Sequence, residues 1–188
     1  QITTIVKLAV EKILKKNVLV VGAGIKTGLN IRIDNPAQLG SDLVVDSVAA
    51  IVEYPAPLLI FDLGTANTVC VIDKNKNYIG GMIYPGIGVS LDSLTAHASQ
   101  LGGISIEAPE HMIGKNTTEC MKSGLIYSSA AAMDGIIDRL QEQLGGEATV
   151  IATGGLAKKI VPHCRREIIL DDDLLLKGLA IIYKKNRK

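Results

Sequence analysis

Aromatic residues are scarce in this chain. Of its 188 residues only 3% are aromatic, with one phenylalanine, five tyrosines and no tryptophan. Proteins that bind single-stranded nucleic acid stack the bases on exposed aromatic rings, which are lacking here. An excess of one charge is lacking too, because 20 Lys and Arg stand against 19 Asp and Glu and leave a formal charge of +1. We therefore expect neither a nucleic-acid partner nor a membrane surface.

Paired cysteines and long apolar runs are also missing from the sequence. Cys70, Cys120 and Cys164 are odd in number, far apart and without a C-x-x-C motif, so we interpret them as buried thiols of a reducing compartment. The first 17 residues alternate in charge, unlike a secretory signal, and runs such as Val18–Val21 are too short to cross a bilayer. These features predict a cytoplasmic protein.

The residues that are present indicate an α/β protein. With 47% apolar residues, the chain can bury one sizeable core or the cores of two small lobes. Hydrophobic periodicity predicts helices over residues 3–16, 42–54, 90–101, 123–144 and 172–186, and another from 157. Short β-branched runs predict strands over residues 17–22, 58–62, 68–73, 78–83 and 149–152. Because prolines follow the second helix, we expect a lobe boundary that divides the chain into residues 1–57 and 58–188.

A carboxylate and several small polar residues follow a predicted buried strand in Asp62-Leu-Gly64-Thr65-Ala-Asn67-Thr68. A carboxylate at a strand end needs a cation or hydrogen-bond donors. Gly64 lets the backbone approach a phosphate closely, and Thr65 and Thr68 can bond its oxygens. An ordinary glycine turn in a hairpin is the alternative interpretation of this motif.

Tandem glycines follow the last predicted strand, in Thr153-Gly154-Gly155. Glycines at a strand–helix junction allow a flat ligand such as a nucleoside to lie on the backbone near a helix N-terminus. Close packing between strand and helix is the alternative. Two strand-end glycine sites together favour nucleotide binding, although the sequence holds neither a P-loop nor a G-x-G-x-x-G.

Three more polar segments precede predicted helices. Asp42, in Gly40-Ser41-Asp42, is either an N-cap or a functional carboxylate. The loop 114–118 precedes the long helix, which Thr117 or Thr118 can cap. We interpret the run Asp171–Asp173 as a solvated helix start rather than a metal site.

The order of these blocks resembles that of the type III pantothenate kinases, a family of the acetate kinase/sugar kinase/Hsp70/actin superfamily. Six blocks carry the resemblance: Asn35-Pro36 to Asp42, Asp62 to Thr68, Gly80 to Gly86, Ile113 to Thr117, Thr153 to Ala157, and Leu174 to Leu179. It implies an actin-like, ribonuclease H-like ATPase fold with a nearly complete C-terminal lobe and a partial N-terminal lobe. It also implies a cytoplasmic homodimer that phosphorylates pantothenate with ATP, the first step of coenzyme A biosynthesis.

The same resemblance implies a role for each motif. Asp42 would be the general base, or the group that orients the pantothenate hydroxyl. Asp62 would bind a monovalent cation, K⁺ or NH₄⁺, and the reaction would also use Mg²⁺. ATP would be held by Gly64, Thr65, Thr68, Gly154 and Gly155. Pantothenate would be held by Gly40, Ser41, Asp42, Leu43 and Thr117, partly across the dimer interface.

The sequence also departs from the family pattern. Ile33 stands where the family often has tyrosine, Leu43 where arginine follows the aspartate, and Ser128 where glycine is usual. The family's D-x-G-N-T phosphate loop is missing, since the chain begins at the helix that normally follows it. We therefore expect the 188 residues to fold and to dimerise through helix 127–140 without phosphorylating pantothenate. A non-catalytic nucleotide-binding relative with a regulatory or accessory role is the alternative function, and a kinase for another small molecule is a third.

Overall fold

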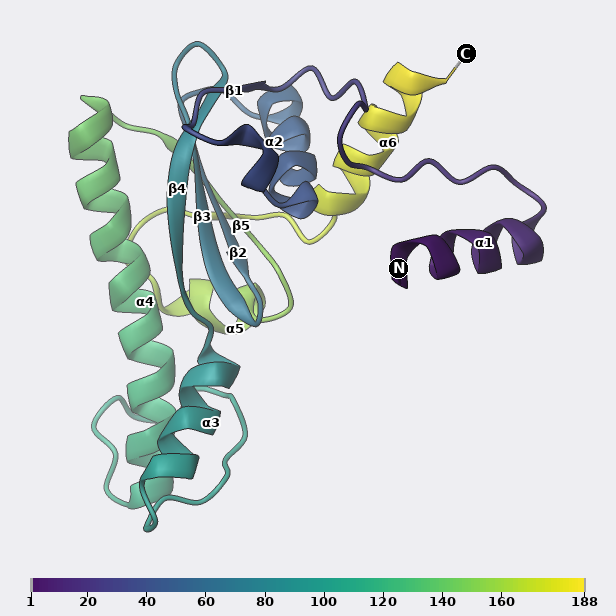
Figure 1. The fold of residues 1–188 in the computed structure, drawn as a ribbon. Coiled ribbons are helices and arrows are strands. Elements are labelled where there is room, and N and C mark those ends of the chain that lie inside the picture. Colours follow the sequence, from purple (N-terminus) through teal and green to yellow (C-terminus); the bar gives the residue numbers. More distant parts are fainter. Residues whose placement is uncertain (1, 188) are drawn as a thin grey trace.

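A mixed six-stranded sheet organises the fold (Figure 1). The computed structural model describes residues 2–187. The strands are β1 (Asn30–Ile31), β2 (Leu58–Leu63), β3 (Ala66–Ile72), β4 (Asn77–Pro85), β5 (Thr149–Thr153) and β6 (Ile169–Leu170), in the order β1-β4-β3-β2-β5-β6. β2, β3 and β4 form an antiparallel meander, whereas β5 runs parallel to β2. The strand ends of β2 and β5 therefore lie at the same edge of the sheet.

Helices cover both faces of the sheet because β2 is apolar on both of its faces. Leu59 and Phe61 belong to a core with α4 (Thr117–Leu144) and the short α5 (Ala157–Ile160). Leu58 and Ile60 point the other way, into a core with α2 (Ser41–Glu53). Fully burying such a side chain contributes about 1.5–3 kcal/mol. The strand is thus fixed from both sides, and so is the residue at its end.

The helix α6 (Leu174–Asn186) packs closely on α2, on the face of the sheet opposite α4 (Figure 1). Gly178 makes this approach possible, since a Cβ there would come within 2.8 Å of the Val45 carbonyl carbon. The 3₁₀ turns are η1 (Pro36–Gln38), just before α2, and η2 (Val161–His163), just after α5. Leu39, in the loop between η1 and α2, packs against the core beneath α2.

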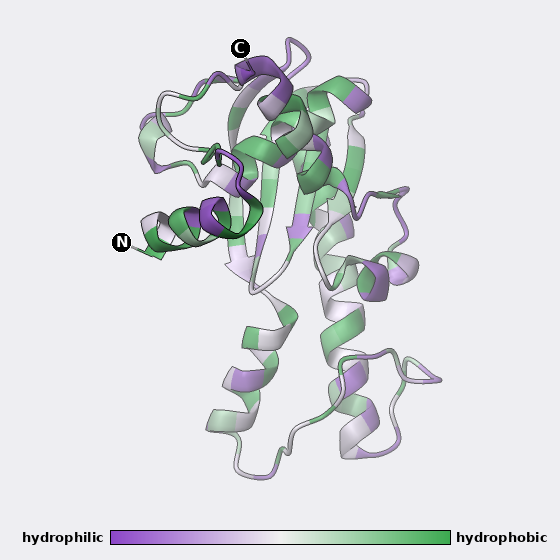
Figure 2. Cartoon of the chain, turned by 90° about the vertical axis from the view of Figure 1, so that its right-hand side faces the viewer, coloured by the Kyte–Doolittle hydropathy of each residue, from purple (hydrophilic) through white to green (hydrophobic). Residues whose placement is uncertain are grey.

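The helix α3 (Ile87–His97) and the first half of α4 project beyond the sheet as an arm (Figures 1 and 2). α4 begins six residues before the predicted position, at Thr117 rather than residue 123. Its N-cap is Asn116, whose side-chain oxygen accepts the Glu119 backbone N–H at 3.0 Å. The expectation that Thr117 or Thr118 caps this helix is therefore wrong, because the neighbouring asparagine has taken that place.

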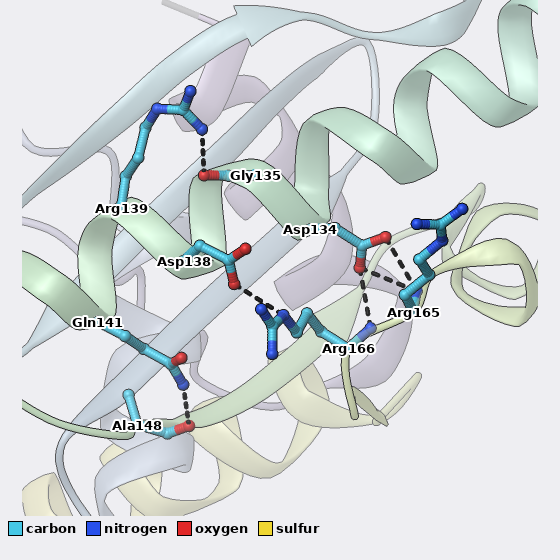
Figure 3. A network of polar contacts seen from close by, with 8 residues as sticks. All are labelled: Asp134, Gly135, Asp138, Arg139, Gln141, Ala148, Arg165 and Arg166. Carbon is cyan, nitrogen blue, oxygen red and sulfur yellow. Dashed lines mark hydrogen bonds and ion pairs between the residues drawn. The ribbon is translucent and has the colours of Figure 1, made fainter.

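A polar network fixes the chain after η2 to the middle of α4 (Figure 3). The Asp134 carboxylate accepts the backbone N–H groups of Arg165 and Arg166 at 2.9–3.0 Å. The Arg166 guanidinium pairs with Asp138 at 2.7 Å. These contacts hold the connection from β5 to β6 against α4.

The N-terminal segment differs from the prediction. α1 (Ile2–Leu14) forms as expected but buries no residue, and it stands apart from the sheet (Figure 1). Its large apolar side chains other than Val10 are exposed. Residues 17–22 do not form the predicted strand, because no strand of the described residues lies beside them to share backbone hydrogen bonds. The interpretation of all three cysteines as buried thiols holds for Cys70; it is wrong for Cys120, which is exposed, and Cys164 is only half-buried.

Two sequence expectations concern larger features. The division of the chain after residue 57 stays a prediction; α2, which precedes it, packs on the sheet together with α6. Within residues 2–187, no helix combines the length and hydrophobicity that crossing a membrane requires.

Candidate functional site

A cleft of about 550 Å³ opens where α2 begins and where β2 and β5 end. It contains residues of three predicted motifs that lie far apart in the sequence. Its lining residues are Asp42, Asp46, Asp62, Thr153, Gly154, Gly155, Lys158, Asp172 and Leu175. The fold thus brings the three candidate motifs at Asp42, Asp62 and Gly154–Gly155 into one hollow.

Strand register places three oxygen-bearing side chains next to one another at the edge of the sheet where the cleft opens. Asp62 of β2 pairs with Thr68 of β3 on one side and with Thr153 of β5 on the other. Side chains of directly paired residues lie on the same face about 4.5–5.5 Å apart at their Cβ atoms. The Thr68 hydroxyl is buried and has no hydrogen-bond partner among the described residues. Thr68 is thus a direct neighbour of Asp62 with an unused hydroxyl, although it is not among the residues that line the cleft.

Asp42 stands in the first turn of α2 but is not its N-cap. That position belongs to Gly40, and Asp42 Oδ1 accepts the backbone N–H of Leu43 at 3.0 Å. The side chain is exposed at the mouth of the cleft. Because capping does not explain this aspartate, its carboxylate is available for a ligand.

The surroundings of Asp62 disfavour the ionised form of its carboxyl group. Burial, and next the charge of Asp42, raise the pKa of Asp62 above its usual range. The two carboxylates therefore repel each other across the cleft. A bound cation would relieve this repulsion.

Asp46 is a functional candidate that sequence reasoning missed. It lies one helical turn after Asp42 on the same face of α2, is 2% exposed, and has an Oδ1 atom without a hydrogen-bond partner. Burial, followed by the charges of Asp62, Asp42 and Asp171, raises the pKa of Asp46 to about 7. The i, i+4 spacing from Asp42 was the signal that could have found it.

The backbone at Gly154 leaves no room for a side chain, whereas the space beside Gly155 is open. Gly154 has a φ of +92°, and a Cβ there would lie 2.6–2.7 Å from the Leu63 backbone. The Leu156 N–H donates to the Leu63 carbonyl at 3.2 Å, so the glycine turn is fastened to the end of β2. No atom lies within 4 Å of a Cβ placed on Gly155. The junction therefore combines close strand packing at one glycine with an open surface at the next.

Gly64 and Thr65 form the turn between β2 and β3, next to Asp62. The Gly64 N–H donates to the Ala66 carbonyl at 3.3 Å, and the Thr65 carbonyl accepts the Gly86 N–H at 3.0 Å. The Thr65 side chain is exposed. The turn is thus ordered by its backbone and leaves its hydroxyl free, but neither residue lines the cleft itself.

The predicted acceptor-binding residues do not all meet. Gly40 and Leu43 line a neighbouring groove of about 490 Å³, and Ser41 is exposed between them. Thr117 lines neither hollow, because the start of α4 lies beside α3 at the far end of the molecule from α2 (Figure 1). Within one chain, the structure separates Thr117 from Asp42.

Of the aspartates in the run Asp171–Asp173, which follows β6, Asp171 has a structural role. Asp171 is 6% exposed and accepts hydrogen bonds from Lys177 at 2.7 Å and from Tyr54 at 2.8 Å. Although burial opposes ionisation, these hydrogen bonds hold the pKa of Asp171 below its usual range. The interpretation of this run as a solvated helix start is therefore wrong for Asp171. Its neighbour Asp172 is exposed and pairs with Lys158, the one basic residue among the cleft's described lining residues.

Solved structures with the same arrangement define the class of fold. A protein described as a Baf family transcriptional activator, from Campylobacter jejuni, covers 85% of this chain and 70% of its own, with a TM-score of 0.56 and 22% identity. The ethanolamine utilization protein EutJ from Carboxydothermus hydrogenoformans covers 97% of this chain and 72% of its own, with a TM-score of 0.53 and 15% identity. The strand order and these likenesses define the actin-like ATPase fold.

Sequence comparison then specifies the family. The model of the type III pantothenate kinase family matches residues 1–139. Type III pantothenate kinases from Exiguobacterium sibiricum and Bacillus cytotoxicus are 48% and 46% identical over 168 and 176 residues, which are 89% and 94% of this chain. The chain belongs to the type III pantothenate kinase family. It spans about two thirds of these relatives, 66% and 67% of their lengths.

Proposed function

We propose that this chain carries the site at which the γ-phosphoryl group of ATP passes to the hydroxyl of pantothenate, the first step of coenzyme A biosynthesis. The observation that carries the proposal is the single cleft lined by Asp42, Asp62 and Gly154–Gly155. Family membership supports the same reaction. A cytoplasmic location belongs to this proposal as well.

The nucleotide would lie on the strand–helix junction at one wall of the cleft. The open surface over Gly155 suits a flat adenosine, and Gly154 keeps the backbone close to the end of β2. Gly64, Thr65 and Thr68 stand at the adjoining strand ends, where they would bond phosphate oxygens. ATP, when bound, supplies the phosphoryl group.

Asp42 would act on the acceptor hydroxyl. Its carboxylate is exposed at the mouth of the cleft and is oriented by the Leu43 N–H. In phosphoryl transfer, placing the attacking hydroxyl contributes more than removing its proton. Asp42 would accept the hydroxyl's hydrogen bond and take its proton as the hydroxyl oxygen bonds to the γ-phosphorus and the bond from that phosphorus to the β-phosphate oxygen breaks, which releases ADP.

The residues around Asp62 fit a monovalent cation. The Asp62 carboxylate and the unpartnered Thr68 hydroxyl are direct neighbours on adjacent strands, and both offer oxygen to K⁺ or NH₄⁺. No group of three or more His, Cys, Asp or Glu side chains within residues 2–187 is arranged to hold a metal ion by itself. Because Mg²⁺ is commonly bound by one or two carboxylates together with substrate phosphates, we propose that the cleft aspartates hold it with the nucleotide.

A homodimer would account for the position of Thr117. Since Thr117 lies far from Asp42 in one chain, it would reach pantothenate only from a second copy (Figure 1). Mixing Asp42→Asn and Thr117→Ala proteins tests this arrangement. Two inactive parents should regain part of the activity in the mixed dimer, whereas a Thr117 role within one chain predicts no recovery.

The proposed function is tested with the natural gene product in a coupled assay for ADP formation, with and without pantothenate. We expect ADP formation to depend on pantothenate. Calorimetry with a non-hydrolysable ATP analogue provides the second readout. Nucleotide binding without pantothenate-dependent ADP would favour the non-catalytic alternative, and failure to bind the analogue would overturn the assignment of the cleft.

A further inference from the structure

The loop before α4 carries an unpaired lysine close to Thr117. Lys115 lies two residues before Thr117, and its side chain is exposed. Among the described residues, no carboxylate forms an ion pair with its ammonium group. Lys122, the other lysine of the arm, pairs with Glu107. Lys115 is therefore the positive charge that the described residues leave without a partner at the end of the arm.

Local contacts fix this loop on the start of α4. The Glu119 carboxylate accepts the backbone N–H of Lys115 at 3.1 Å, and the Asn116 side chain accepts the backbone N–H of Glu119 at 3.0 Å. Gly114 lies so close to the helix that a Cβ there would come within 2.7 Å of the Glu119 carbonyl carbon. Lys115 and Thr117 are thus held in a fixed relation, and both side chains are exposed. A molecule that meets Thr117 therefore has Lys115 beside it.

The groove beside the cleft contains no cation from its own chain. It lies between residues 33–43 and residues 78–83, and Leu43, which directly follows Asp42, is part of its wall. Of the described residues that line the groove, Asp34 is the one that carries a charge. A molecule whose hydroxyl reaches Asp42 can extend along this groove, where its own chain offers it an aspartate and no lysine or arginine.

Pantothenate carries its hydroxyl at one end and a carboxylate at the other. If Asp42 holds the hydroxyl, the carboxylate lies along the groove, where it loses hydration and is repelled by Asp34. In the proposed function, a second copy of the chain brings its Thr117 to the acceptor. The same copy then brings Lys115, whose charge suits the carboxylate and offsets the repulsion.

We propose that Lys115 of a second copy pairs with the carboxylate of pantothenate and is the residue that selects the anion over uncharged alcohols of the same shape. Asp42 and Lys115 would hold the two ends of one acceptor from two different chains. This inference rests on the proposed function, in which Thr117 acts across the dimer, and it names a specificity-determining residue for that site.

The first test compares pantothenate with panthenol, which carries a hydroxymethyl group in place of the carboxylate. Rates of ADP formation are measured in the natural gene product. We expect Lys115→Gln to raise the KM for pantothenate about tenfold, the loss of one charge-assisted hydrogen bond, with kcat unchanged and the KM for panthenol unchanged. Lys115→Arg keeps the charge and should keep the preference. Lys74→Gln removes a lysine at an exposed position of the β3–β4 turn and is the matched control.

The second test asks which chain supplies the lysine. Asp42→Asn protein is mixed with Lys115→Gln protein under conditions that exchange subunits. In the mixed dimer, one site combines Asp42 from one copy with Lys115 from the other, so activity with the parental KM for pantothenate should appear. If Lys115 acts within its own chain, every active site in the mixture keeps the raised KM.

The outcomes separate this inference from the proposed function. Equal changes for pantothenate and panthenol in Lys115→Gln, or a parental KM for both, would overturn the role of Lys115 while the proposed function stands. Failure of the mixed dimer to show the parental KM would overturn the placement of Lys115 in the second copy. Absence of pantothenate-dependent ADP formation in the parent protein would instead overturn the proposed function, and this inference with it.

Discussion

The two hollows on either side of the first turn of α2 have opposite chemistry. Four aspartates and one lysine line the cleft, whereas six aliphatic side chains, one tyrosine and one aspartate line the groove. The cleft is built from the ends of β2 and β5, which the core holds from both faces. The groove is built from a 3₁₀ turn and the outer part of the sheet. Changes in the cleft should therefore affect the reaction and the stability of the fold, and changes in the groove should affect binding of the acceptor.

Asp42→Asn should have the largest effect on the cleft. Asn keeps the shape and can still accept the Leu43 N–H, but it removes the charge that orients the hydroxyl. In the full-length natural gene product, we expect the rate of phosphoryl transfer to fall about 10²–10⁴-fold while the dissociation constant of ATP changes little. Asp92→Asn, at an exposed position on α3, is the matched control and should keep the parental rate. A parental rate in Asp42→Asn would remove this residue from the mechanism.

Asp46→Asn tests the buried end of the cleft through the pH dependence of stability. Because the folded-state pKa is about 7 and the reference value is 3.8, the folded protein holds a proton that the unfolded chain releases. Asp46 therefore lowers the free energy of unfolding as pH rises from about 4 to 7. At pH 8, Asn should stabilise the protein by on the order of 2 to 4 kcal/mol relative to Asp, with little difference at pH 4.

Urea denaturation of both proteins at pH 4 and pH 8 measures this difference. An equal effect of the substitution at both values would show that Asp46 ionises normally. The cleft would then not differ from the groove by holding a buried carboxyl group with a raised pKa.

Gly154→Ala and Gly155→Ala should separate packing from ligand contact. Alanine at Gly154 meets the Leu63 backbone at a positive φ, so the free energy of unfolding should fall by about 1–3 kcal/mol without any ligand. Alanine at Gly155 enters open space and should leave this energy unchanged while weakening nucleotide binding. Thermal unfolding with and without ATP compares the two, and equal effects of both variants would contradict the division of roles.

The smallest expected effect is that of the monovalent cation. If Asp62 and Thr68 hold K⁺, replacing Na⁺ by K⁺ should raise the apparent affinity for ATP severalfold. This affinity is measured from the thermal stabilisation that ATP gives. Asp62→Ala should abolish this dependence. Identical melting curves in the two salts, with Asp62→Ala behaving like the parent, would contradict the cation site.

Much of the fold could be predicted because local patterns and packing agree. The apolar run at Leu58–Leu63 and the helical period of Ser41–Glu53 both describe elements that the core buries, and the structure confirms both. The same patterns failed at residues 17–22, where a β-branched run has no neighbouring strand among the described residues. Residues Ile5, Leu8 and Ile13 share a helical face, yet all three are exposed. Hydrophobic periodicity predicts a helix or strand, but it does not show whether another segment packs against the apolar face.

The candidate site was predicted only in part, for a similar reason. Motifs at strand ends identified Asp62 and Gly154, because register places such residues at one edge of the sheet. Lys158 carries no motif, and the one signal for Asp46 is its i, i+4 spacing from Asp42, so the packing of α2 and α5 was needed to show that both residues face the cleft. Thr117 belongs to a family motif, but its place in the arm depends on tertiary structure that no spacing reveals.

The central claim is that the cleft binds the nucleotide and the groove binds the acceptor. Hydrogen–deuterium exchange tests it most directly, because each ligand should slow amide exchange only where it binds. A non-hydrolysable ATP analogue should protect residues 62–65 and 153–160, and pantothenate added with it should further protect residues 33–43 and 80–83. Protection of one common segment by both ligands, or of the groove by the nucleotide alone, would contradict the account.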